Sequence, residues 1–133
     1  GDNTRNFLHV ADVASAFEKI LHAGVEGHVY NIGGTNEYSV LQVAKDLMRI
    51  FEVDPDGGQQ LTEFGDDRVF NDLRYTINSD KLHALGWKEQ KTWAQGLRET
   101  VEWYRANSSR FGDIEHCLVA HPRAGLGQED SSV

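Results

Sequence analysis

Apolar residues recur at helical spacing in four stretches of the chain, separated by turns and polar segments. The period of about 3.6 residues predicts amphipathic helices over residues 12–23, 39–51 and 92–106. A shorter helix is expected to begin at Ser79 and to end before Gly86. The chain is therefore expected to be largely helical.

Polar residues stand where three of these helices should begin. Asp12 is placed to cap the first helix, because a carboxylate oxygen can accept the free backbone N–H groups of a first turn. Ser39 with Gln42, and Thr92 with Gln95, have the three-residue spacing of a capping box. These signals give the predicted helices defined starts.

Two further stretches favour extended backbone. Residues 28–32 are rich in β-branched and aromatic residues and are followed by Gly33 and Gly34, which predicts a buried strand ending in a turn. Residues 61–64 could form another short strand, and residues 75–77 look extended. The expected fold class is α/β, mostly helical with short strands.

One polar stretch, residues 65–75, follows neither a helical nor a strand period. It contains Arg68 and Arg74 among three aspartates, and its arginines present planar groups of N–H donors that suit phosphate or carboxylate oxygens. It is interpreted as a recognition loop for an anionic ligand. The alternative is a surface loop in which the arginines and aspartates pair with one another.

Composition narrows the possible partners. The 133 residues include 13 basic and 21 acidic ones, and the net charge of -8 argues against nucleic acids and anionic membranes as partners. Cys117 is the single cysteine, so no internal disulfide can form, and no run of 18 apolar residues is present. A cytoplasmic protein is expected. Because the chain begins with Gly1 rather than methionine, it is also expected to be a piece of a longer protein.

Several kinds of reactive site are disfavoured by the sequence. No glycine-rich turn has the spacing of a dinucleotide fingerprint, and no tyrosine is followed four residues later by lysine, the catalytic pair of short-chain reductases. His116, Cys117 and His121 lie close together but lack the spacing of a recognised zinc site. No catalytic residue and no metal ligand is therefore expected.

Five blocks occur in a characteristic order. They read Arg-Asn-Phe-Leu-His-Val-x-Asp from Arg5, Tyr-Asn-Ile-Gly-Gly-x-Asn-Glu from Tyr30, Asp-Arg-x-x-Asn-Asp-x-Arg-Tyr from Asp67, Lys-Leu-x-x-Leu-Gly-Trp from Lys81 and Gly-Leu-x-x-Thr-x-x-Trp-Tyr from Gly96. Through them the chain resembles the C-terminal part of the nucleotide-sugar 4,6-dehydratases, which are extended short-chain dehydrogenase/reductase proteins. The resemblance covers about residues 1–107, and residues 108–133 are expected to form a tail, disordered from about residue 125.

The resemblance implies a nucleotide-sugar-binding lobe. Arg5, Asp67 and Arg68 would contact the nucleotide and its diphosphate, and Asn71 and Tyr75 complete the expected substrate-binding set. NAD would be bound by an N-terminal Rossmann lobe that is absent here, and the parent protein would be a homodimer. The wording of residues 71–75 is similar to plant-type UDP-rhamnose synthases. Bacterial members often have histidine at the position of Asn71, so both dTDP-glucose and UDP-glucose stay open as substrates.

Two other interpretations stay open. The chain could belong to a UDP-sugar epimerase or decarboxylase of the same fold, or it could be a non-catalytic remnant or interaction module. As a lobe that packs on another domain, it should expose an apolar patch when isolated and should self-associate.

Overall fold

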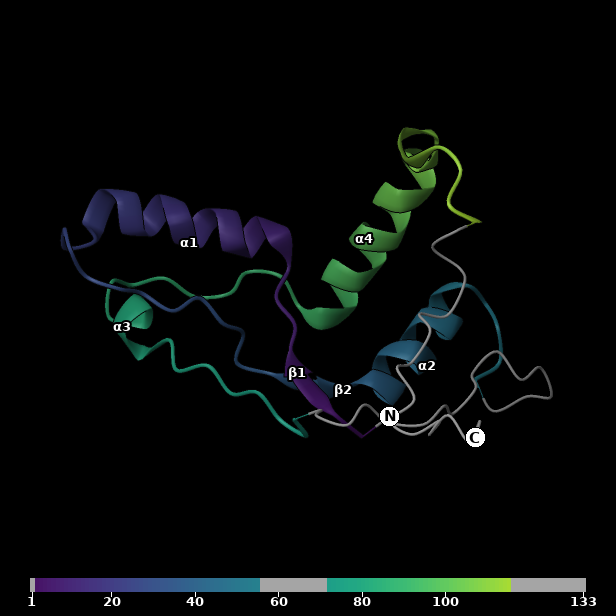
Figure 1. The fold of residues 1–133 in the computed structure, drawn as a ribbon, viewed down its shortest axis with the longest axis horizontal. Helices are drawn as coiled ribbons and strands as arrows, with labels where there is room; N and C mark the ends of the chain where they lie inside the picture. The colour runs from purple at the N-terminus through teal and green to yellow at the C-terminus, as the bar shows by residue number, and fades with distance from the viewer. Residues whose placement is uncertain (1, 56–71, 116–133) are drawn as a thin grey trace, which may run out of the picture.

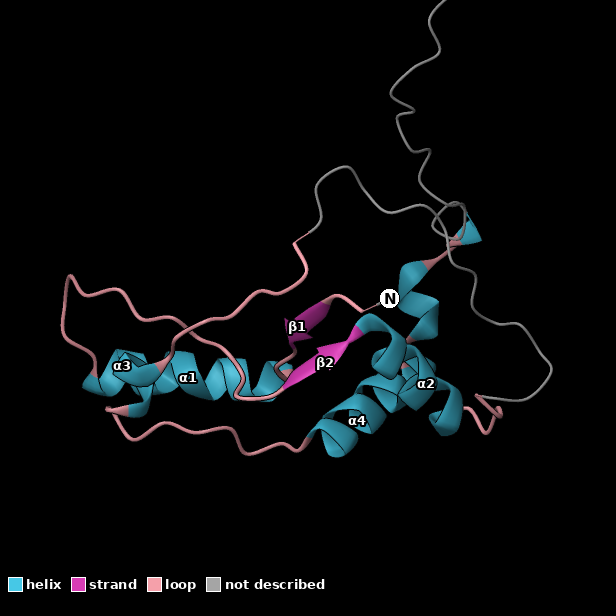
Figure 2. Ribbon diagram, turned by 90° about the horizontal axis from the view of Figure 1, so that it is seen from below, coloured by secondary structure: helices cyan, strands magenta, loops and turns pink. Residues whose placement is uncertain are grey.

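The structure is a computed structural model and describes residues 2–55 and 72–115. Figures 1 and 2 show two groups of helices with a short sheet between them. Helices α1 (Val10–Ala23) and α3 (Asp80–His83) lie at one end, and α2 (Val40–Ile50) and α4 (Trp93–Ala106) lie at the other. The strands β1 (Thr4–Asn6) and β2 (Glu37–Ser39) connect the two groups. The expectation of a mostly helical chain with short strands is confirmed.

Helix α1 begins two residues before the predicted start. His9 is its N-cap, and the Nδ1 atom of His9 accepts the backbone N–H of Ala11 at 3.3 Å. The prediction that Asp12 caps the helix is therefore wrong. Asp12 lies inside the first turn, where it is 2% exposed and points its carboxylate at the segment before α4. The helix ends at Gly24, as the sequence indicates.

The capping signals of α2 and α4 have different outcomes. Thr92 and Gln95 form both halves of the predicted capping box at the start of α4. Ser39 caps α2 by accepting the backbone N–H of Gln42 at 3.1 Å, but the Gln42 side chain donates to Asp46 at 2.8 Å instead of returning to Ser39. The predicted box of α2 is thus only half formed, because an acceptor one turn along the helix competes for the amide.

The third predicted helix is shorter than expected. α3 has four residues, and the turn after it ends at Gly86, which has a φ of 85°. Leu82 of this helix is fully buried and forms a small core with Ala16 and Trp87. The Trp87 indole N–H donates to the Ser15 hydroxyl at 2.9 Å, which links this core to α1. The core therefore holds α1 against the segment 79–87.

The sheet was not predicted. β1 and β2 pair antiparallel, with Arg5 opposite Tyr38 and Asn6 opposite Glu37. Arg74, just before the residues expected to be extended, adds an isolated parallel bridge to Thr4, and residues 75–77 themselves form no strand. A 3-10 helix, η1 (Ser108–Phe111), lies in the part assigned to a tail and was also not expected.

The predicted buried strand at residues 28–32 is not formed. The segment has no strand pairing, and Val29 is 78% exposed. Two hydrogen bonds that involve side chains join it to α3 and the residue before Ser79 instead: Lys81 Nζ donates to the Val29 carbonyl at 3.1 Å, and the Asn31 side chain donates through Nδ2 to the Asn78 backbone carbonyl at 3.2 Å. A strand needs a neighbour of matching backbone, and the described residues do not provide one here.

Other sequence predictions fall outside the described residues. These are the possible strand at 61–64, the group of His116, Cys117 and His121, and the disorder expected from about residue 125. Within residues 2–55 and 72–115, no helix is long and apolar enough to span a membrane.

Candidate functional site

Arg5 and Tyr75, two of the predicted site residues, lie against each other. The Cζ atom of Arg5 is 4.6 Å from the centroid of the Tyr75 ring, a distance typical of a cation–π contact. Arg5 Nη1 also donates to the backbone carbonyl of Thr4 at 2.7 Å. The ring and the carbonyl together orient the guanidinium, although the two residues are far apart in the sequence.

The Asp72 carboxylate affects the ionisation of the Tyr75 hydroxyl. A hydrogen bond to the Asp72 carboxylate, and the negative charge of that carboxylate, raise the pKa of Tyr75, while the Arg5 charge opposes the shift. The hydroxyl therefore stays protonated at neutral pH. Tyr75 is 54% exposed, so its hydroxyl can reach a ligand from solvent. This arrangement suits binding and does not generate a tyrosinate base.

The other predicted site residues cannot be placed beside this pair. Asp67, Arg68 and Asn71 lie outside the described residues, and their assignment stays a prediction.

Glu37 binds several side chains on the face of the strands opposite to Arg5. Its carboxylate accepts from Arg74 Nε, at 2.9 Å to Oε1 and 2.7 Å to Oε2, and from the Thr4 hydroxyl at 3.2 Å. Thr76 adds a longer contact of 3.4 Å. The hydrogen bond from Arg74 outweighs burial and lowers the pKa of Glu37, so the carboxylate is ionised at neutral pH.

Sequence reasoning gave Glu37 no role. Arg74, which stood out as a possible ligand contact in the polar stretch, is instead paired with Glu37. Its partner is thus a glutamate of β2, and not the aspartate of the same loop that the alternative interpretation expected. The available signal was the alternation of polar and aromatic residues at 37–39, which is typical of a strand with two different faces.

A cleft of about 230 Å³ opens beside the sheet, between β2 and the start of α4. Aromatic rings form much of its wall: Tyr38 stacks on Trp93 with centroids 4.2 Å apart, and Phe7 lies 5.4 Å from Trp93. Burial, with the nearby charges of Glu89 and Asp46, raises the pKa of Tyr38. Because Tyr38 pairs with Arg5 across the strands, the cleft borders the Arg5 side of the sheet.

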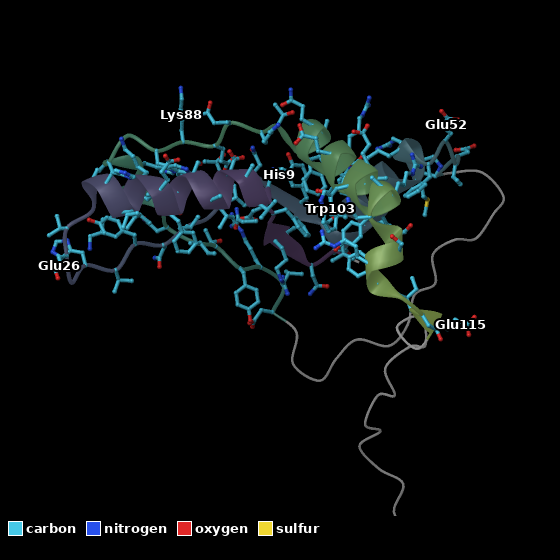
Figure 3. The ribbon with its side chains drawn as sticks, turned by 90° about the horizontal axis from the view of Figure 1, so that it is seen from above. His9, Glu26, Glu52, Lys88, Trp103 and Glu115 are labelled. Carbon is cyan, nitrogen blue, oxygen red and sulfur yellow. The ribbon has the colours of Figure 1, made fainter. Side chains whose placement is uncertain are left out.

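Polar residues from α1 and α4 meet at the far side of this cleft. His9 lies where α1 begins, close to α4 (Figure 3). Its Nε2 atom is 3.8 Å from Glu99, which also pairs with Lys91 at 2.6 Å. Gly96 allows the approach, since a Cβ atom there would lie 3.2 Å from the His9 ring. Among the described residues, no group of three or more His, Cys, Asp or Glu side chains could hold a metal ion.

Sequence comparisons identify related proteins over nearly the whole chain. The family model described as GDP-mannose 4,6 dehydratase matches residues 1–100. The trifunctional UDP-glucose 4,6-dehydratase/UDP-4-keto-6-deoxy-D-glucose 3,5-epimerase/UDP-4-keto-L-rhamnose-reductase RHM1 of Arabidopsis thaliana is 43% identical over 141 residues, covering 100% of this chain and 21% of that protein. The dTDP-D-glucose 4,6-dehydratase of Homo sapiens is 39% identical over 124 residues, covering 92% of this chain and 35% of that protein.

Solved structures give a consistent result. dTDP-glucose 4,6-dehydratase from Bacillus anthracis in complex with NAD is 37% identical with a TM-score of 0.70, covering 80% of this chain and 33% of that one. DesIV, a dTDP-glucose 4,6-dehydratase from Streptomyces venezuelae with NAD and TYD bound, is 31% identical with a TM-score of 0.73, covering 83% and 33%. The chain thus spans about a third of the length of these enzymes and about a fifth of RHM1.

Proposed function

Because the chain belongs to the nucleotide-sugar 4,6-dehydratase family, we propose that it is the substrate-binding portion of an NAD-dependent enzyme of this kind. The substrate would be dTDP-glucose or UDP-glucose, and the product the 4-keto-6-deoxy sugar. The observation that carries the proposal is the contact of Arg5 with Tyr75, which joins two predicted ligand contacts at one place.

Arg5 is suited to the diphosphate of such a substrate. Its guanidinium is held between the Thr4 carbonyl and the Tyr75 ring, so little side-chain freedom remains to be lost when an anion binds. A charge-assisted hydrogen bond of this type contributes about 1.5–3 kcal/mol. The net charge of -8 makes a local cation necessary, because the chain as a whole repels an anionic ligand.

The remaining contacts follow from the same assignment. The neutral Tyr75 hydroxyl donates to Asp72, and its oxygen can still accept a hydrogen bond from a sugar hydroxyl. Asp67, Arg68 and Asn71 would contribute from the stretch that leads into Asp72. In this proposal the chain binds and orients the substrate, and it supplies no group that reacts with the sugar.

NAD does not fit the described residues. Their strands form an antiparallel pair, and none of them leads through a glycine-rich turn into a helix that could receive a pyrophosphate. In the proposed enzyme NAD, which accepts and returns a hydride, would therefore bind residues outside this part of the chain. The role left to these residues is recognition of the nucleotide sugar.

The relatives favour one of the two candidate nucleotides, UDP or dTDP, in the substrate. The Arabidopsis thaliana enzymes named UDP-glucose 4,6-dehydratases are 43–47% identical to the chain, and the vertebrate dTDP-D-glucose 4,6-dehydratases are 39–40% identical. These identities favour UDP-glucose. A UDP-glucose 4-epimerase from Bifidobacterium longum, at 23% identity, shares the fold alone and gives no support to the epimerase alternative.

We also propose that the protein is cytoplasmic. A single cysteine rules out an internal disulfide, in keeping with the reducing cytoplasm.

Exposed apolar residues on α1 support self-association, and we propose a homodimer for the whole enzyme.

Ligand-observed NMR with UDP-glucose and dTDP-glucose tests the proposed function. The wild-type chain should bind UDP-glucose, and Arg5→Ala should weaken binding about tenfold or more, the factor that corresponds to losing one charge-assisted hydrogen bond. Arg68→Ala should have an effect of the same sign. Arg98→Ala, an exposed arginine on α4, is the matched control and should bind as the wild type does. Equal binding by wild type and Arg5→Ala would overturn the site.

A further inference from the structure

The segment that carries Tyr75 is attached to β1 by few backbone contacts. The Thr4 backbone N–H donates to the Leu73 carbonyl at 2.9 Å, and the side-chain Nδ2 of Asn3, the residue before β1, donates to the Asp72 carbonyl at 3.2 Å. The bridge between Thr4 and Arg74 is isolated and does not extend into a ladder. So short a pairing specifies its register weakly, and a shift of one residue would exchange the two faces of the segment.

Side chains on the two faces have separate tasks. Thr4 and Arg74 point to one face, where both bind the Glu37 carboxylate. The residues that follow them, Arg5 and Tyr75, contact each other on the other face. The register that lets Arg74 reach Glu37 is therefore the register that places the Tyr75 ring under the Arg5 guanidinium.

Glu37 has the contacts needed to maintain this register. Its side chain is 19% exposed and binds β1 through Thr4 and the 74–76 segment through Arg74 and Thr76. Arg74 itself is 65% exposed, so this pair would be weak if it were isolated. The shared carboxylate makes it part of a network that includes β1, β2 and the third segment.

We propose that Glu37 is a positioning residue for the substrate site: by holding Thr4 and Arg74 on one face of the strands, it keeps Tyr75 against Arg5 on the other. Its effect on ligand affinity rests on the proposed function, whereas its effect on the Arg5–Tyr75 contact does not. Glu37 has no contact with the ligand in this scheme and acts through the two residues that do.

NMR on the labelled full chain tests the positioning directly. The Tyr75 ring should shift the Arg5 side-chain resonances upfield, and Tyr75→Leu defines the size of that shift. Glu37→Gln and Arg74→Met weaken the network from its two ends. Each should reduce the upfield shift of the Arg5 resonances by more than half. Glu102→Gln, the same change on the exposed face of α4, should retain it. The indole N–H resonance of Trp93, which bonds to Asp46, reports whether the rest of the fold is intact.

Binding of UDP-glucose gives the second readout. Glu37→Gln should weaken binding several-fold while the Trp93 resonance is unchanged. The proposal would be overturned if both network variants retained the Arg5 shift. It would also be overturned if they lost the Arg5 shift and the Trp93 resonance together, because Glu37 would then serve the fold in general. If Arg5→Ala binds UDP-glucose like the wild type, the proposed function fails, and the resonance shifts still decide the positioning role.

Discussion

The buried carboxylate of Asp12 accepts the backbone N–H of Gln90 at 2.9 Å. Its second oxygen accepts the N–H of Lys91 at 3.1 Å, so one side chain in the first turn of α1 holds the segment that leads into α4. Asp12 is 2% exposed, and these donors compensate the cost of burying it. The contact connects the helical end that contains α1 to the start of α4.

Replacing Asp12 should therefore destabilise the chain. Asp12→Ala leaves two backbone N–H groups without their acceptor and should lower the free energy of unfolding by about 1–3 kcal/mol. Urea denaturation followed by circular dichroism measures this loss. Asp2→Asn, a change of an exposed aspartate, is the control and should have little effect. Equal unfolding midpoints for the Asp12 variant and wild type would contradict the role of this contact.

Asp46 connects α2 to α4, and the stability that this connection contributes should be lost in acid. Burial alone would raise its pKa, but hydrogen bonds from Gln42, Trp93 and Arg49 outweigh burial and lower the pKa below the ordinary value of 3.8. A lowered folded-state pKa stabilises the protein above the unfolded-state pKa, and that stability is lost as the pH falls through the folded-state pKa. The contribution is thus complete above about pH 5 and declines below about pH 4.

Urea unfolding at several pH values checks this connection. Between about pH 5 and about pH 3 the wild type should lose more free energy of unfolding than Asp46→Asn, which cannot titrate at this position. Tryptophan fluorescence is a suitable signal, because one of the three tryptophans, Trp93, donates its indole N–H to Asp46 at 2.8 Å. Parallel pH curves for the two proteins would show that Asp46 has no such contribution.

Gly33 allows a close approach that a side chain would prevent. A Cβ atom at this position would lie 2.9 Å from the Cβ and 3.0 Å from the Cγ2 of Ile77, on the segment between Tyr75 and α3. Gly33→Ala should therefore cost about 1–3 kcal/mol, the range for overpacking a close contact. Thermal or urea unfolding measures the loss.

A second substitution separates crowding from other effects of Gly33→Ala. Ile77→Gly removes the two atoms nearest to the new methyl group and leaves the Ser79 Oγ at 3.3 Å, so the double variant should lose less stability than the sum of the two single variants. Strict additivity would mean that the contact with Ile77 is not the cause.

The apolar face of α1 should make the isolated chain self-associate. Val10, Phe17 and Leu21 are 74%, 63% and 83% exposed and recur at spacings of seven and four residues. Light scattering should show an apparent mass that rises with concentration, and the double variant Phe17→Lys/Leu21→Glu should reduce it. Ile114→Glu, a comparable change at a 48% exposed residue outside α1, should not. A monodisperse wild-type monomer would contradict the prediction.

Local sequence signals were sufficient to locate the three longer helices of the described residues. The spacing of apolar residues indicated α1, α2 and α4, and Thr92 with Gln95 formed the expected capping box, because caps and helical periods involve residues three or four positions apart. Even here competition mattered, since His9 caps α1 in place of Asp12. The five ordered blocks that resembled the nucleotide-sugar 4,6-dehydratases led to the family that the comparisons confirm.

The tertiary structure decided which distant residues meet. The pairing of β1 with β2, the absence of a strand at 28–32 and the Glu37 network depend on partners about thirty or more positions away, for which a single sequence has no periodic signal. The sequence by itself determined the positions of α1, α2 and α4, the family, and Arg5 and Tyr75 as candidate ligand contacts. Only the fold placed that guanidinium against that ring, because strand register, rather than any local pattern, determines which face each side chain occupies.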